Sequence, residues 1–396
     1  HQYPHTADPA PQIGFLQEAL RWWDYWLKGV ETGVRSDPAY RVWQQDSTRP
    51  ARVREYRPGR WLAMADWPTA RTGMRRWHLA QGGLKSAPET IEIQVNSPMD
   101  CGFGTGLYFP MSGMVPQMSG DQRDDDARSA CFDTAPLGEP LDIVGAPQVR
   151  LRLKADRPAA QIAIRLCEVH PDGASNRLSY GVLNLCHRNS HEVPEAIEPG
   201  EEFVITVRLD QMAARVEPGM RLRLAVSSAY WPFLWPSPER STLTLLEGQV
   251  DLPLCADVAG DEWQFDEAEG AEPWAHRNLR PALYERTRTH DLGTGEITLQ
   301  TINDEGLNED AEHGLISGAL IRETLAIHPD DPLSATAEVK WTQELRRGHW
   351  DIRTETAARM WSDADNFYLS ARIEAFEGGE KVYATDFEEQ VPRDHG

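Results

Sequence analysis

The sequence predicts a mainly β protein, with a jelly-roll β-sandwich preceded by one helix and followed by a second all-β unit. Short runs that alternate apolar and polar residues recur from about residue 40 onwards, and turn sequences rich in Gly and Pro separate them. One long helical pattern precedes these runs, within the first 29 residues. These two observations define the predicted fold class.

The helix is predicted over residues 14–29. Its apolar side chains recur at helical spacing as a wide stripe, Glu18 and Arg21 are spaced to pair on the outer face, and Gly29 provides a C-terminal stop. Three tryptophans on so short a helix need a large body to pack on. The chain opens on His1 without a Met. We therefore expect it to be the tail of a longer polypeptide.

The sandwich is predicted over about residues 39–255. Alternating runs typical of half-buried strands occur at residues 149–154, 161–166, 203–209 and 221–226. The turn sequences Pro-Asp-Gly, Glu-Pro-Gly and Glu-Pro-Gly separate them, at residues 171–173, 198–200 and 217–219. Many short strands with such turns favour an antiparallel sandwich.

A second all-β unit is predicted after an acidic linker. Residues 256–272 are acidic and low in apolar content. Strand patterns then resume at residues 296–299, 319–327, 337–341, 350–356 and 367–375. We therefore divide the chain into residues 1–38, 39–255 and 256–396.

Composition excludes several classes of function. The net charge of −22 argues against nucleic acid and anionic membrane surfaces as partners, because phosphate binding needs a basic surface. No apolar run approaches the roughly 18 residues of a membrane span. Five scattered cysteines without a C-x-x-C pair predict buried free thiols, which favours a reducing, cytoplasmic location.

Common catalytic and metal motifs are absent from the sequence. The nearest approach to G-x-S-x-G, at residues 314–318, has the wrong spacing. Gly102, Gly104 and Gly106 lack a following helix, so a tight loop is favoured over a phosphate cradle. The group formed by Cys186, His187 and His191 does not have the spacing of a common metal site. For the acidic run 121–126, a solvated loop or an Arg-paired turn is favoured over a calcium site, because the Glu-terminated loop pattern is missing. We expect no cofactor and no metal.

Several motifs, taken in order, resemble one family. They are His1 followed by Ala19–Gly29 (ALRWWDYWLKG), Asp121–Arg123 with Cys131–Leu137, Val144–Pro147, Val169–Gly173, and Pro218–Ser228 with Trp231-Pro232. Together they resemble the CocE/NonD group of serine hydrolases, which includes X-Pro dipeptidyl-peptidases, cocaine esterase and α-amino-acid ester hydrolases. Met220 departs from the group's more usual His. The resemblance spans residues 1 to about 255, and residues 256–396 resemble an extension seen in some longer members.

The resemblance implies a role for the N-terminal region. Residues 1–38 would be the C-terminal remnant of an α/β-hydrolase domain, and residues 39–255 a jelly-roll (galactose-binding-like) sandwich of the X-Pro dipeptidyl-peptidase C-terminal type. His1 would be the histidine of a Ser-Asp-His triad whose other members lie outside the chain. His5 is the alternative for that role. Without the resemblance, both histidines are simply terminal residues.

The resemblance also implies substrates and partners. The substrate would be a small X-Pro peptide, an ester or an amide, and the protein partner would be the hydrolase domain. A homo-oligomer is compatible with this interpretation. The fragment alone is expected to be inactive. Phe15, Leu20, Trp23 and Trp26 should then form the apolar patch that the chain leaves least well covered.

Two further expectations concern the sandwich. In the family the sandwich helps to wall the active site, which makes Trp231, Trp235 and the loop 101–110 candidates for that contact, alongside ordinary packing. The second functional hypothesis is a non-catalytic β-sandwich module that binds carbohydrate or protein, because the fold alone does not decide function.

Overall fold

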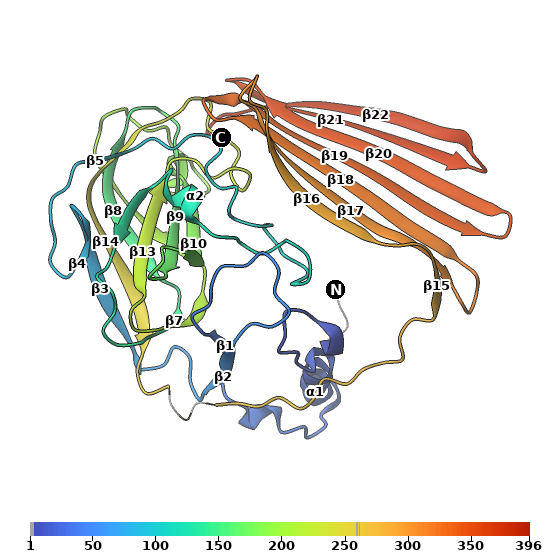
Figure 1. Ribbon diagram of the computed structural model, residues 1–396, viewed down its shortest axis with the longest axis horizontal. Helices are drawn as coiled ribbons and strands as arrows, with labels where there is room; N and C mark the ends of the chain where they lie inside the picture. Colours follow the sequence, from blue (N-terminus) through green and yellow to red (C-terminus); the bar gives the residue numbers. More distant parts are fainter. Residues whose placement is uncertain (1–3, 259, 261) are drawn as a thin grey trace.

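The computed structural model describes residues 4–258, 260 and 262–396, and it confirms a mainly β protein (Figure 1). The strands form three sheets, two of which face each other as a sandwich while the third projects from it. Helical segments in the described residues are short, namely η1 (Pro4–Thr6), α1 (Phe15–Lys28), η2 (Val34–Ser36), α2 (Arg123–Asp126) and η3 (Leu185–His187).

The larger sheet of the sandwich has a central path with three strands attached beside it. All its pairings are antiparallel except β1 with β12, which are parallel at Gln45 and Ala214. The path runs β11 (Phe203–Arg208), β8 (Gln148–Ala155), β14 (Leu243–Cys255), β7 (Leu141–Gly145), β12 (Met212–Val216), β1 (Tyr40–Gln45) and β2 (Gly59–Met64), and the attached strands are β3 (Thr72–Ala80), β4 (Gly83–Lys85) and β5 (Ile93–Val95).

The smaller sheet packs over the larger one and closes the main core. Its strand order is β10 (Ser175–Asn184), β9 (Gln161–Val169), β13 (Arg221–Ser227) and β6 (Ala130–Asp133). Leu151 of β8, Ile164 of β9 and Leu224 of β13 are wholly buried in one apolar cluster between the sheets. Burying these inward faces is the main force that holds the sandwich together.

The predicted sandwich strands are found close to their expected positions, with one difference in burial. β8 and β11 alternate buried with exposed or half-buried residues, as expected for half-buried strands. β9 is instead buried at every residue. Its second face is covered because the wholly buried Arg165 donates hydrogen bonds to Gln122 and Ser129, which lie in the segment 121–129.

The third sheet extends from the sandwich as long antiparallel strands, coloured orange to red in Figure 1. Five of its strands correspond to predicted runs, but the sequence interpretation missed three others. The order is β15 (His276–Arg280), β17 (Ile297–Asp310), β18 (Ile316–His328), β19 (Asp331–Arg347), β20 (Trp350–Ser362), β21 (Asn366–Glu377) and β22 (Glu380–Pro392), with β16 (Leu283–His290) also paired to β17. The missed strands are β15, β16 and β22, in which polar and charged residues predominate.

The acidic segment between β14 and β15 connects the sandwich to the third sheet. Its described residues form no regular helix or strand, and Glu262 makes one isolated bridge to Leu62 of β2. In the part of the chain that the structure describes, every helix is too short or too polar to cross a membrane.

Candidate functional site

Ion pairs hold one side of helix α1 to the segment that follows it. Arg21 donates hydrogen bonds to Glu18, at 2.9 Å, and to Asp37, which follows η2. Arg41 of β1 donates to the same Glu18 carboxylate at 3.0 Å. The helix ends at Gly29, whose φ of 68° is the left-handed conformation that glycine adopts without strain. The predicted C-terminal stop is therefore confirmed.

The apolar stripe of α1 lies in solvent. No residue of the helix is buried, and Phe15, Leu20, Trp23 and Trp26 are 62%, 58%, 54% and 56% exposed. The four side chains are exposed as expected, but they are not the least covered, since Leu27 of the same helix is 74% exposed and Tyr108 of the sandwich 79%. Apolar patches of this kind on a protein surface mark sites where another surface binds.

The histidine proposed from the family motif cannot be placed. His1 lies outside the described residues, and so do the two residues that follow it. His5, the alternative, lies in η1 and is half-buried. Its ring packs against the linker, since a Cβ added at Gly270 would lie 3.0 Å from His5 Cδ2. His5 therefore lies beside the segment that leads into the third sheet.

The glycine-rich loop binds a carboxylate of its own chain. The backbone N–H groups of Gly102 and Gly104 donate to the two oxygens of Asp125, at 3.0 Å and 2.8 Å. A Cβ at Gly102 would lie 2.4 Å from the carbonyl oxygen of Trp231, so the loop has no room for a side chain. The preference for a tight loop over a phosphate cradle fits this geometry, because Asp125 occupies the place where a ligand anion would bind.

The acidic run beside this loop also has internal partners. Asp126 pairs with Arg165 and Arg223, each at 3.0 Å, and its side chain is only 4% exposed. Asp121 pairs with Arg123 at 2.7 Å. Asp121, Asp125 and Asp126 thus have partners within the chain. The arginine partners of Asp121 and Asp126 agree with the Arg-paired turn that the sequence favoured over a calcium site. The role of Asp125 was missed, although three consecutive aspartates close to G-x-G-x-G could have suggested it.

Trp231 and Trp235 lie at the junction between the sandwich and the third sheet. Trp231 is 2% exposed and packs in a cluster with Ile297 and Leu299 of β17. Trp235 donates its indole N–H to Ser362 Oγ of β20 at 3.0 Å. Both tryptophans therefore contact the third sheet, and their suggested contact with a hydrolase domain stays a prediction.

The loop 101–110 divides into a buried and an exposed half. Its first six residues, 101–106, are buried, whereas Tyr108 and Phe109 are 79% and 70% exposed. Tyr108 packs edge-on against Phe233, with ring centroids 5.6 Å apart. Only the exposed half of this loop can therefore reach a further protein surface.

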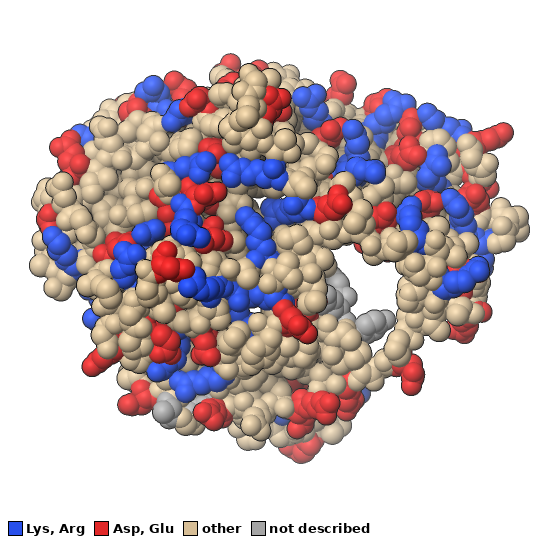
Figure 2. Space-filling view, viewed as in Figure 1, with Lys and Arg blue, Asp and Glu red and all other residues tan. Residues whose placement is uncertain are grey.

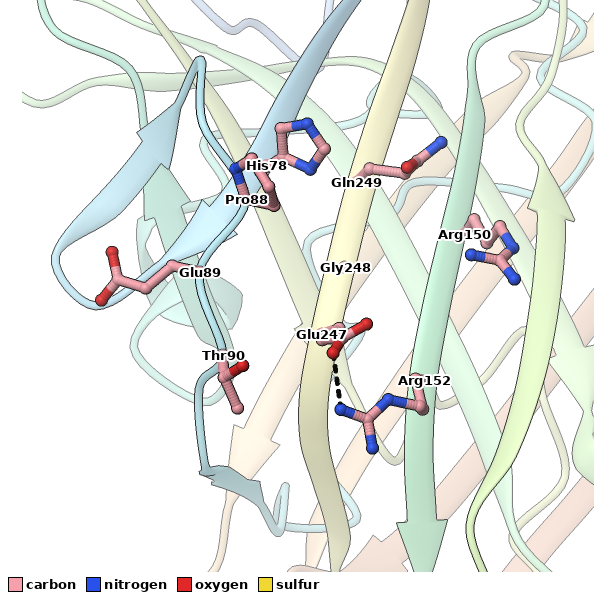
Figure 3. A pocket seen from close by; sticks show the side chains of 9 residues that line it. All are labelled: His78, Pro88, Glu89, Thr90, Arg150, Arg152, Glu247, Gly248 and Gln249. Atoms are coloured by element: carbon pink, nitrogen blue, oxygen red, sulfur yellow. Dashed lines mark hydrogen bonds and ion pairs between the residues drawn. The ribbon is translucent and has the colours of Figure 1, made fainter.

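A polar groove of about 320 Å³ crosses the outer face of the larger sheet (Figure 3). Figure 3 shows Arg152 of β8 paired with Glu247 of β14, at 2.7 Å, and His78 of β3 across from Gln249. Arg152 also pairs with Glu202, so its charge is balanced within the chain. The groove has no Trp, Tyr or Phe in its lining, and such aromatic rings are what would have supported carbohydrate binding.

The sequence of the sandwich matches one protein family. The profile of the X-Pro dipeptidyl-peptidase C-terminal non-catalytic domain matches residues 32–286. The chain belongs to this family. The match includes both sheets of the sandwich, the linker and the start of the third sheet, and most of the third sheet lies beyond it.

Comparisons with individual proteins confirm the resemblance to the CocE/NonD group. Cocaine esterase of Rhodococcus sp. (strain MB1 Bresler) is 24% identical over 189 residues, which cover 43% of this chain and 32% of that protein. The curated relatives that the chain matches are hydrolases, and the chain spans about a third of their length.

One solved structure shares the fold, and a second is similar to a lesser degree. An aminopeptidase from the marine sediment archaeon Thaumarchaeota archaeon superposes with a TM-score of 0.51 at 17% identity, over 64% of this chain and 47% of that one. A CocE/NonD family hydrolase from Staphylococcus aureus gives a TM-score of 0.47 at 12% identity, over 60% and 45% of the two chains.

Proposed function

We propose that the chain is the C-terminal part of a serine hydrolase that cleaves acyl bonds, in X-Pro peptides or in small esters and amides. A preceding α/β-hydrolase domain would supply the Ser nucleophile and the Asp, and His1 would transfer the proton between nucleophile and leaving group. The sandwich and the third sheet have no catalytic group in this proposal. They would support and shape the domain that does the chemistry.

The observation that carries the proposal is the exposed apolar stripe of α1. The helix begins at Phe15, a short stretch after the proposed histidine, and no residue of the helix is buried among the described residues, with Trp23 and Trp26 54% and 56% exposed. A hydrolase domain that packed on Trp23 and Trp26 would bury this surface, which is a favourable contribution of roughly 1.5–3 kcal/mol for each large side chain fully buried. Cocaine esterase, named above, is about three times as long as the region that matches this chain.

The decisive experiment compares two proteins. The complete polypeptide encoded by the gene and the chain 1–396 are purified and assayed with p-nitrophenyl acetate and with alanyl-prolyl-p-nitroanilide. We expect turnover only by the complete polypeptide, and the preferred substrate identifies the bond class. Turnover by the chain 1–396 alone would contradict the proposal, because that chain would then have to hold its own nucleophile.

Two variants of the complete polypeptide test which histidine acts. His1→Ala is expected to lower kcat by at least about 10³-fold, since removing one triad member removes the nucleophile's activation. His5→Ala serves as the matched control and should retain most of the activity. The reverse result would move the catalytic role to His5.

A second pair of variants tests the helix. Trp26→Glu should leave the melting temperature of the chain 1–396 nearly unchanged, because Trp26 is exposed there, but it should destabilise the complete polypeptide by about 2 kcal/mol or more. Leu292→Glu, at a turn residue that is 89% exposed, is the control and should change neither protein. Equal effects of Trp26→Glu on both proteins would remove the support that α1 gives to the proposal.

A further inference from the structure

The two faces of the third sheet differ in chemistry. On one face, ion pairs cross from strand to strand: Arg372 of β21 pairs with Asp386 of β22 at 3.0 Å, and Lys381 pairs with Glu374 at 2.6 Å. Successive residues of a strand point to opposite faces, so this charged face also carries the even-numbered residues of β19, including Lys340. We call it the charged face.

The opposite face is predominantly apolar over β19 to β22. The register aligns Val339, Ala358, Ala371 and Phe387 in one row across four strands. The neighbouring row contains Ala337, Met360, Leu369 and Glu389. These two rows line a groove of about 230 Å³. We call this side of the sheet the apolar face.

Large apolar side chains on this face are accessible to solvent. Trp341, Leu369 and Phe387 are 45%, 42% and 57% exposed, and Tyr383 and Val391 of the same face are 56% and 46% exposed. Stable sheets bury their apolar side against another layer. Because this sheet is a single layer with exposed apolar rows, those rows are a candidate binding surface.

One end of the apolar face is already an interface. Ile297, Leu299, Ile327 and Ala335, which lie on β17 to β19, pack with Met99, Phe103 and Trp231 of the sandwich in one buried cluster. Phe367 of β21 continues this contact by packing edge-on against Trp235. The exposed rows extend the same face beyond the sandwich, so whatever covers them must lie beside the sandwich as well.

The start of the chain lies along the connection to this sheet. Gln17 of α1 bonds to the backbone of Glu267 and Glu269, and the His5 ring packs against Gly270. Figure 2 shows an open space through the molecule that is bordered by the third sheet and by the linker beneath it. A domain joined to the N-terminal end of the chain would therefore start next to the linker that enters the sheet.

Charge repulsion opposes the binding of a second copy of the chain to the apolar face. The groove in the apolar face is lined by Glu389 of the edge strand β22, in a chain of net charge −22. A two-fold contact through the groove would bring Glu389 of both copies together, and like charges close together oppose association. A neutral or basic surface of a different domain avoids this cost.

We propose that the apolar face of β19–β22 docks the α/β-hydrolase domain that precedes residue 1, so that the third sheet and the sandwich hold that domain between them. This inference rests on the proposed function. The third sheet would be a clamp, with Phe387, Leu369 and Met360 buried against the hydrolase domain and the charged face left in solvent.

Oxidative footprinting tests the proposal directly. Hydroxyl radicals oxidise exposed Met and aromatic side chains, and the oxidation of Met360, Phe387 and Tyr368 is measured by mass spectrometry in the chain 1–396 and in the complete polypeptide. We expect Met360 and Phe387 to be oxidised at least about five-fold more slowly in the complete polypeptide. Tyr368 lies on the charged face, stacked on Trp361, and serves as the internal control whose rate stays the same.

A variant pair strengthens the test. In the complete polypeptide, Phe387→Asp should restore fast oxidation of Met360, whereas Gln390→Asp, on the charged face of the same strand, should keep it protected. The melting temperatures of the two variants of the chain 1–396 check that both fold.

The outcomes separate this inference from the proposed function. Ester hydrolysis by the complete polypeptide together with equal oxidation of Met360 in the two proteins would overturn the docking proposal and leave the hydrolase proposal standing. Protection of Met360 in the chain 1–396 that grows with concentration, with a dimer in sedimentation, would also overturn it in favour of a second copy.

Discussion

Trp235 of the sandwich donates its indole N–H to Ser362 of β20 at 3.0 Å, across the junction with the third sheet. Ser362 Oγ also accepts from Arg393 Nη1 at 3.1 Å, and another Arg393 nitrogen donates to the carbonyl of Pro236. The last residues of the chain therefore secure the sheet to the sandwich. This hydrogen-bond set orients the apolar face that the docking proposal uses.

Trp235→Phe is expected to lower the free energy of unfolding by about 1 kcal/mol. The change removes one partly buried hydrogen bond and retains most of the ring packing on Trp231. Urea unfolding followed by tryptophan fluorescence and circular dichroism measures the effect. Trp22→Phe, on the exposed helix, is the control, with an expected change below about 0.5 kcal/mol. A larger effect of Trp22→Phe would show that α1 contributes more to stability than its exposure indicates.

Asp125→Ala is expected to destabilise the chain by about 2–4 kcal/mol, because two buried backbone N–H groups lose their charged acceptor. The adjacent Asp124→Ala is the matched control, since Asp124 is exposed and should change stability by less than about 0.5 kcal/mol. Thermal melts of the two variants give the comparison. Similar melting temperatures for both would mean that the glycine loop does not depend on this carboxylate.

The buried carboxyl of Glu168 is predicted to make the stability of the folded chain depend on pH. Burial raises the pKa of this wholly buried carboxyl above its ordinary value of 4.5, despite the hydrogen bond from Ser47. The folded state then holds the proton more tightly than the unfolded state does, so this group lowers stability as pH rises from about 4.5 through the raised pKa.

Glu168→Gln should remove that dependence. The gain in unfolding free energy over the parent chain should be larger at pH 7 than at pH 4.5, because the parent's buried carboxyl carries less charge at the lower pH. Urea unfolding at the two pH values measures it. A difference that stays constant between them would contradict the predicted direction.

The thiols are expected to be unreactive in the folded chain. None of the five cysteines, all of which the structure describes, forms a disulfide. Burial raises the pKa of Cys101, Cys131 and Cys167 to about 12, so the reactive thiolate is scarce at pH 8. Titration with Ellman's reagent should detect little reaction in the native chain and five thiols in guanidinium chloride. Fast reaction without denaturant would show that one of these sites opens readily.

Local pattern was enough to predict much of this fold. The alternation in residues 149–154 and 203–209 reappears as β8 and β11, because the period of two that places side chains on opposite faces is a property of the strand itself. The helix stop at Gly29 was predicted from the preference of glycine for the left-handed conformation at helix ends. The exposure of Trp23 and Trp26 was predicted from the family resemblance.

The tertiary structure decided what lies against what. The complete burial of β9 depends on the distant segment that pairs with Arg165, and the burial of Trp231 depends on β17, some 66 residues further along the chain. The ligand of the glycine loop is Asp125, a contact between two segments that neither motif specifies alone. The local pattern of residues determines the face of the strand to which each side chain points. The residue that the side chain then contacts depends on how the sheets pack together, and sheet packing depends on the whole chain.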